Sequence, residues 1–360
     1  MDAFDDVAAD SRIRIKNAAA SVTVVVLACA IYVLSPFNRE AMDRLHGPAA
    51  VAITGRDFIL VAMGMYACLL AVYFLLQPSP HVSKSLRFFQ LLASWMRAPA
   101  ASLRGGLSAD DRLALLTTLL KSFFGPMMAF FLMSACMAAW GNATAIIEAV
   151  LYEEGLSALF GQHGFWFALQ AVIFVDVLLF TVGYLVESPR LGNEIRSVDP
   201  TVVGWAAALL CYPPFNIVTS KVLGGQASDF PQFDDPTIHI ALNVTLLVLM
   251  AIYASASLAL GLKASNLTHR GIVSRGPYTV VRHPAYVCKN LAWWIGSAPA
   301  VAVAFGLSLA DGLQAVASVV AWTMLYILRA VTEEDHLRKV DGEYAAYAAR
   351  VRYRFIPGIA

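Results

Sequence analysis

Charged residues and paired cysteines are scarce in this sequence of 360 residues. Lysine, arginine, aspartate and glutamate make up 14% of it and apolar residues 59%, whereas a soluble globular domain has about 25% charged residues. None of the five cysteines belongs to a CxxC pair, so the sequence indicates neither a disulfide framework nor a metal site. The net charge of only +1 argues against nucleic acid as a partner.

Long apolar runs dominate instead, and several reach the roughly 20 residues that a helix needs to cross a bilayer. They predict an all-α, polytopic helical membrane protein with about eight transmembrane helices. The fifth run contains the stretch CYPPFN, whose two prolines predict a kink. The predicted spans are 17–35, 57–77, 115–140, 165–187, 202–222, 237–262, 290–308 and 312–331.

Two polar segments outside these runs are predicted to form amphipathic helices. Within 82–112, the stretch SKSLRFFQLLASWMR favours a helix at the membrane interface, with Arg87 and Arg97 directed toward lipid head groups. After residue 332 the spacing of Tyr344, Tyr347 and Val351 indicates a short cytoplasmic helix that ends before a proline. We therefore divide the chain into an N-terminal membrane region, 1–262, and a C-terminal core, 263–360.

Lysine and arginine set the expected orientation. If the N-terminus is cytoplasmic and the chain crosses eight times, only Arg39, Arg44, Arg56 and Lys221 fall on the far side, which leaves 22 of the 26 basic residues on the cytoplasmic side. This asymmetry is what the positive-inside rule requires. We therefore expect both termini in the cytoplasm and a bacterial inner membrane as the location.

Two charge clusters have the sign opposite to the one that their helix ends favour. Arg282, His283 and Lys289 surround Pro284, where the seventh span begins and the helix dipole is already positive. The acidic residues 333–335 follow the eighth span, where the dipole is negative. Because only a short turn joins the two spans, both clusters are expected at the same depth. They either neutralise each other or together bind a zwitterion.

The motifs around these clusters resemble those of a known family. The stretch GPYTVVRHPAY, the later Glu pair and the tail EYAAYAARVRYRFIPGI resemble the integral membrane methyltransferases, which include isoprenylcysteine carboxyl methyltransferases and phospholipid N-methyltransferases. The resemblance covers about residues 271–360 and implies a cytoplasmic pocket for S-adenosylmethionine, closed by the tail. Cys288 departs from the pattern, which has glycine there. The cofactor-binding residues that it implies are Tyr278, Arg282, His283, Tyr286, Lys289, Asn290, Glu333 and Glu334.

The implied reaction is methyl transfer to a lipophilic acceptor that enters from the bilayer. Glu334 is expected to act as a base or as an electrostatic partner in this reaction, because burial raises the pKa of a carboxylate. Arg275 is expected to orient an anionic acceptor. A prenylcysteine-like carboxylate, a lipid amine, a thiol and a quinone-like lipid all stay open as the acceptor. The sequence does not determine the oligomeric state.

Two rival functions stay open at this point. An NADPH-dependent sterol or steroid reductase shares the RHPxY motif, but such enzymes generally lack the adjacent glutamates that Glu333 and Glu334 provide here. A transporter or lipid-binding membrane protein is the non-enzymatic alternative, favoured by the broken fifth span and by Asp176 within the fourth. We expect Asp176 to pair with Lys121 or with a polar group on another span.

Overall fold

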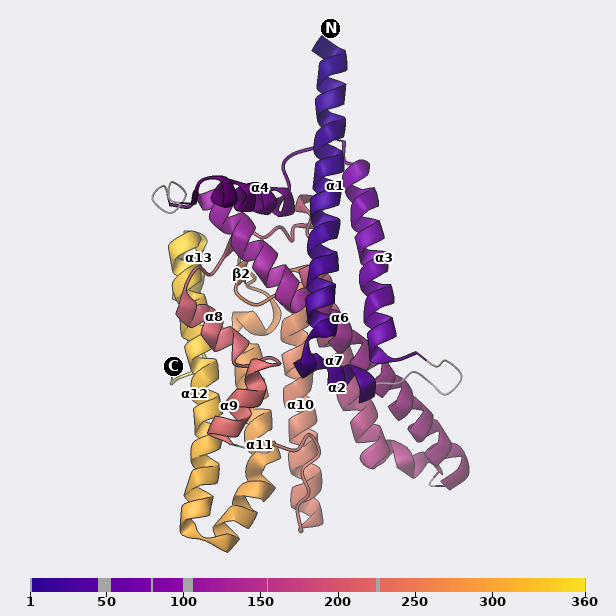
Figure 1. Cartoon of the computed structure of the whole chain (residues 1–360). Coiled ribbons are helices and arrows are strands. Elements are labelled where there is room, and N and C mark those ends of the chain that lie inside the picture. Colours follow the sequence, from indigo (N-terminus) through magenta and orange to yellow (C-terminus); the bar gives the residue numbers. More distant parts are fainter. Residues whose placement is uncertain are drawn as a thin grey trace. The chain divides into compact units, whose positions relative to one another are not determined.

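The protein is almost entirely helical (Figure 1). The computed structural model describes residues 2–44, 53–78, 80–99, 106–153, 155–224 and 227–359, and these form two compact units, Met1–Met137 and Ala138–Ala360. Seven helices in the described ranges are long and apolar enough to cross a membrane, which confirms the predicted all-α polytopic fold. They are α1 (Asp2–Leu34), α3 (Gly55–Leu75), α6 (Ala109–Glu148), α7 (Gln162–Leu185), α10 (Pro236–Leu260), α11 (Pro284–Leu307) and α12 (Leu309–Val340).

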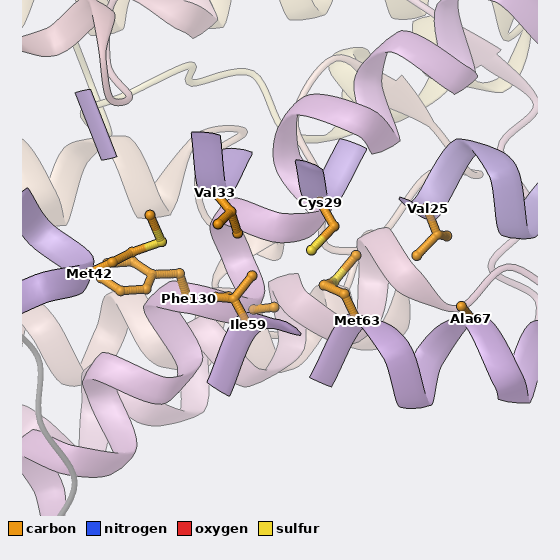
Figure 2. Close-up of a cluster of buried hydrophobic side chains, with 9 residues drawn as sticks. Val25, Cys29, Val33, Met42, Ile59, Met63, Ala67 and Phe130 are labelled. Atoms are coloured by element: carbon orange, nitrogen blue, oxygen red, sulfur yellow. The ribbon is translucent and has the colours of Figure 1, made fainter. Parts of the chain in front are cut away.

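An apolar core holds the first unit together (Figure 2). Helix α1 contributes residues four apart, which therefore share one face, and α3 contributes a matching stripe. The short helix α2 (Pro36–Arg44) and the first part of α6 complete the cluster. Its labelled side chains are Val25, Cys29, Val33, Met42, Ile59, Met63, Ala67 and Phe130.

Helix α4 (Lys84–Arg97) is the predicted amphipathic helix, and none of its residues is buried. The side chain of Ser83 caps it by accepting a hydrogen bond from the amide of Leu86. Arg87 was expected to be directed toward lipid head groups. Arg87 instead forms ion pairs with Asp110 and Asp111 at the start of α6, at 2.9 and 2.8 Å, because two carboxylates there complement its guanidinium.

Helices α7 and α10 of the second unit run in the same direction. Near their starts the rings of Phe165 and Phe230 lie 4.6 Å apart. Near their ends Gly183 packs against the backbone of Ala264. The chain between them must therefore return along the bundle, and it does so through α8 (Val202–Leu209) and α9 (Phe215–Leu223), which both pack against α12 (Figure 1).

The predicted fifth span is thus two short helices rather than one. Cys211 and Tyr212 form a turn, and the prolines that follow lack the amide hydrogen needed to continue the helix. The kink predicted from these residues is confirmed, and the broken segment is not among the seven continuous helices.

Loops and short helices close one end of the second unit. Strands β1 (Ser197–Val198) and β2 (Thr268–His269) pair antiparallel, with Ser197 opposite His269. Helix α13 (Glu343–Arg350) is the predicted C-terminal helix, and it buries Tyr344, Tyr347 and Val351. The remaining short elements are η1 (Ala149–Glu153), η2 (Gly155–Phe160), η3 (Pro189–Leu191), η4 (Gly261–Lys263) and η5 (Gly276–Thr279).

The last two long helices form the predicted antiparallel hairpin. The side chain of Ser308 caps α12 at the turn by accepting a hydrogen bond from the amide of Asp311. Both helices extend beyond the predicted spans, since α11 begins at Pro284 and α12 continues to Val340. Lys289 and the acidic cluster are therefore within the helices, and Arg282 and His283 directly precede α11, at the end of the hairpin opposite the turn.

Replacing Gly183 with alanine is expected to destabilise the protein by about 1–3 kcal/mol, the usual cost of overpacking. A Cβ at this position would overlap the carbonyl oxygen of Ala264. Gly64, inside α3, is the matched control, since a Cβ there meets nothing within 4 Å. Thermal unfolding in detergent should show a lower midpoint for Gly183→Ala and an unchanged or higher one for Gly64→Ala. Equal midpoints would contradict the close packing of α7.

Candidate active site

The C-terminal tail folds back onto the turn before α11. The amides of Arg282 and His283 donate hydrogen bonds of 3.0 Å to the carbonyl oxygens of Tyr353 and Arg354. The guanidinium of Arg282 also donates to the carbonyl oxygen of Val351, at 2.8 Å. The RHP sequence and the tail are thus joined through the backbone, which fixes the position of both.

Glu334 lies at the centre of this junction, with none of its side chain exposed. Its Oε1 accepts hydrogen bonds from Arg282 Nε at 2.8 Å and Arg354 Nε at 3.0 Å, and lies 3.2 Å from His283 Nε2. Its Oε2 accepts from Arg354 Nη2 at 2.9 Å and from Arg338 Nη2 at 3.3 Å. One carboxylate therefore connects α12, the turn before α11 and the tail.

These contacts favour a positioning role for Glu334 over the expected role as a base. Both of its oxygens are engaged by guanidinium groups, so the carboxylate is the anion that a buried arginine cluster requires. The hydrogen bonds to Glu334 also raise the pKa of Arg354 above its usual value. At this residue the two charge clusters neutralise each other.

Glu333, by contrast, lies on the wall of a cavity. The hydroxyl of Tyr286 donates a hydrogen bond to its Oε1. His283 Nδ1 lies 3.9 Å from Oε2, and Arg329 Nη2 lies 4.0 Å from Oε1. The imidazole of His283 stacks on the ring of Tyr286, with centroids 5.5 Å apart and planes at 11°. Glu333 is therefore a carboxylate beside two aromatic faces and in contact with the cavity.

The cavity has a volume of about 210 Å³ and lies within the second unit, among α10, α11, α12, α13 and the loops around β2. It brings together six of the eight residues that the family resemblance implied for the cofactor: Tyr278, Arg282, His283, Tyr286, Lys289 and Glu333. Asn290 and Glu334 are not in its lining. Asn290 donates instead to the carbonyl oxygen of Tyr286, at 2.8 Å.

The expected catalytic residue Arg275 is also absent from the cavity lining. Its Nε donates to the carbonyl oxygen of Ala259, at 3.0 Å, near the end of α10. Cys288, where the resembling family has glycine, is buried in α11 and likewise does not line the cavity.

Two tyrosines of α13 complete the cavity wall on the tail side. Tyr347 donates from its hydroxyl to the carbonyl oxygen of Tyr278, at 2.9 Å. Burial raises the pKa of Tyr347 to about 12, so its hydroxyl is a neutral donor at physiological pH. Tyr344 packs beside it, with ring centroids 5.9 Å apart. The tail thus forms part of the site and shields the cavity.

Sequence reasoning missed Arg329 and two of the tyrosines around it, Tyr212 and Tyr326. Arg329 is 3% exposed and donates from Nη2 to Asn266 Oδ1, at 2.8 Å. Its guanidinium carbon lies over the rings of Tyr212, Tyr286 and Tyr326, at 5.8, 5.1 and 5.2 Å. The signal that points to it is a charged residue inside an apolar run, which is costly in a membrane and marks functional sites.

Asp176 of α7 lies near the same region. Its Oδ2 accepts a hydrogen bond from the hydroxyl of Tyr253, at 2.7 Å, and its Oδ1 accepts one from the hydroxyl of Ser257. Both partners are on α10, which confirms the alternative in which Asp176 pairs with polar groups on another span.

The helical bundle, with a polar and aromatic cavity at one end of its last helices, defines a polytopic membrane protein with an internal cavity. The chain belongs to the family described as protein of unknown function DUF1295, whose profile matches residues 161–351. This range contains every residue that lines the cavity. The family includes steroid 5α-reductase-like membrane proteins. The match gives no evidence for a specific methyltransferase family. No curated protein and no solved structure matches the chain.

Proposed function

We propose that this protein is a membrane-embedded methyltransferase that uses S-adenosylmethionine and acts on a lipophilic acceptor. The observation that carries the proposal is the placement of Glu333 on the cavity wall, beside the rings of His283 and Tyr286, in a cavity that cationic side chains also line. A cavity with both charge signs and stacked aromatic faces suits a ligand that carries both signs itself.

The lining residues fit the charged groups of this cofactor. Its sulfonium and ammonium are cations, for which the carboxylate of Glu333 is the matching partner. Its carboxylate is matched by Arg270, which is 3% exposed and whose Nη2 has no hydrogen-bond partner within the described part of the chain. Such an unsatisfied buried donor is costly without a ligand. We therefore assign Glu333 to the cationic end and Arg270 to the anionic end.

The bound cofactor supplies the methyl group, and the protein positions the acceptor in line with it. Glu334 holds the RHP turn, α12 and the tail in fixed relation, which keeps the rings of His283 and Tyr286 beside Glu333. The tyrosines of α13 exclude water from the site. A carboxylate acceptor needs no general base in this arrangement, which agrees with the engagement of both Glu334 oxygens.

A second candidate function is NADPH-dependent reduction of a sterol-like lipid. It is favoured by the family match and by Lys263, Arg270 and Arg329 in the cavity lining, because guanidinium and ammonium groups also bind phosphate. It leaves Glu333 without a role, since a carboxylate on the wall repels a polyanionic cofactor.

Calorimetric titration of the detergent-purified protein distinguishes the two functions. We expect S-adenosylmethionine to bind, and S-adenosylhomocysteine to bind more weakly because its sulfur is uncharged. NADPH is expected not to compete. Binding of NADPH together with no heat from S-adenosylmethionine would reject the methyltransferase and leave the reductase.

A further inference from the structure

We propose that Lys289 and Arg329, with the aromatic rings around them, form a subsite for the anionic head group of a single-chain lipid. That the bound lipid is the methyl acceptor rests on the function proposed above. That an anionic lipid binds at this subsite does not depend on that function.

Three aromatic rings surround the ammonium of Lys289. Its Nζ lies 5.3 Å from the centroid of Trp293, 5.7 Å from Tyr326 and 5.9 Å from Tyr253. These rings come from α10, α11 and α12, so the packing of three helices holds the ammonium in place. Cation–π contacts of this kind stabilise a desolvated cation by up to about 2 kcal/mol, but they do not neutralise it.

Arg329 also lies over the ring of Tyr326, which both cations therefore share. Its Nε is buried and has no hydrogen-bond partner among the described residues. Its closest acidic group, the carboxylate of Glu333, lies 4.0 Å away and already accepts the hydroxyl of Tyr286. One donor of this guanidinium is therefore left for a ligand in the cavity.

The acidic side chains near Lys289 do not form an ion pair with it in the described part of the chain. Asp176 interacts with Lys289 only through space, since its two oxygens accept hydrogen bonds from Tyr253 and Ser257. Asp229 also interacts electrostatically with Lys289. Among the described residues, Lys289 thus has no ion-pair partner, and Arg329 has only the long contact with Glu333, at 4.0 Å. Such weak pairing of two cations is unfavourable away from water.

This arrangement selects between the acceptors that the sequence left open. A lipid with a cationic head would meet two like charges, and the rings that suit a cation are already filled by the protein's own side chains. An anionic head instead meets an ammonium without an ion-pair partner among the described residues, and a guanidinium whose contact with Glu333 is 4.0 Å long. Lys289 is in the second turn of α11 and Arg329 one turn before Glu333, so both lie deeper in the hairpin than the proposed cofactor end.

Lys289 is therefore reassigned from the cofactor to the lipid. The family resemblance implied a cofactor role for it, but its neighbours in the structure are the rings of three membrane helices rather than the tail. A lipid in the bilayer reaches this depth with its head while its chain remains among apolar side chains.

A scintillation proximity assay with tritiated palmitate on the purified full-length protein tests the subsite. We expect saturable binding that unlabelled palmitate competes for at least tenfold better than hexadecanol or hexadecylamine, which share its chain length. Lys289→Gln should weaken palmitate binding at least tenfold, and Lys289→Arg should retain most of it. The control Lys339→Gln removes an exposed lysine at the end of α12 and should bind palmitate as the unmodified protein does.

The outcomes separate this inference from the proposed function. Equal competition by hexadecanol and palmitate, or unchanged palmitate binding by a folded Lys289→Gln protein, overturns the subsite. S-adenosylmethionine affinity is measured on the same variants and is expected to stay within about twofold of the unmodified protein. Lysine-dependent palmitate binding without any S-adenosylmethionine binding would keep the subsite and reject the methyltransferase.

Discussion

Glu334→Gln is expected to destabilise the protein by about 3–5 kcal/mol, the range found when one partner of a buried ion pair is removed. The substitution keeps the shape of the side chain but removes the charge. It leaves the guanidinium of Arg282 largely buried and without an anion, and it weakens both contacts with Arg354. Because these groups join the tail to the RHP turn, the tail should detach at a lower temperature than in the unmodified protein.

Thermal unfolding in detergent measures this effect, with Asp335→Asn as the matched control. Asp335 is the next residue of α12 and is exposed, so losing its charge should change the midpoint little. Limited proteolysis gives a second readout, since a detached tail should be cut near Val351 first. Equal midpoints for the two variants would show that the buried junction does not hold the tail.

Glu333→Gln is expected to weaken S-adenosylmethionine binding by roughly 10- to 100-fold, because a hydrogen bond to a charged group contributes about 1.5–3 kcal/mol. The folding stability should stay close to that of the unmodified protein, since Glu333 is partly exposed and its contacts with His283 and Arg329 are long. Replacing Glu334 is thus expected to lower the folding stability, whereas replacing the adjacent Glu333 is expected to lower the affinity for S-adenosylmethionine.

Calorimetric titration checks this difference, with Glu343→Gln as the control. Glu343 is exposed at the start of α13, close to the tail but outside the cavity lining. The affinity for S-adenosylhomocysteine should fall less than that for S-adenosylmethionine, since the ammonium is the only cationic group of the former, whereas the latter also has a sulfonium. Unchanged S-adenosylmethionine affinity in Glu333→Gln would remove the observation on which the proposed function depends.

The charge clusters could be placed from the sequence because helix geometry alone determines their relative depth. Pro284 and Glu333 are at similar distances from the short turn between α11 and α12, so an antiparallel hairpin brings them to one end. His283 and Glu334 indeed lie 3.2 Å apart. No knowledge of the other helices was needed for this step.

The roles of the two glutamates could not be predicted in the same way. Adjacent residues on a helix point about 100° apart, so which one faces the cavity depends on the rotation of α12. That rotation is set by contacts with Arg282 and with Arg354 of the tail, which are far away in the sequence. The motif identifies the pair, and the tertiary packing distinguishes its members.

The aromatic end of the cavity was missed for a related reason. Tyr212 comes from the break between α8 and α9, and Tyr253 comes from α10, so neither has a local motif that links it to Arg329 or Lys289. Only the return of the chain through the broken segment brings them together. The break itself was predictable from the adjacent prolines, but its consequence for the cavity was not.

Transfer of label from [methyl-³H]S-adenosylmethionine to extractable lipid tests the central claim most directly. Membranes containing the unmodified protein should transfer tritium to lipid, and membranes containing equal amounts of folded Glu333→Gln protein should transfer at least tenfold less at limiting cofactor. Equal rates of tritium transfer by the unmodified protein and the Glu333→Gln protein would contradict the account. So would the absence of tritium transfer by the unmodified protein in membranes where it oxidises NADPH.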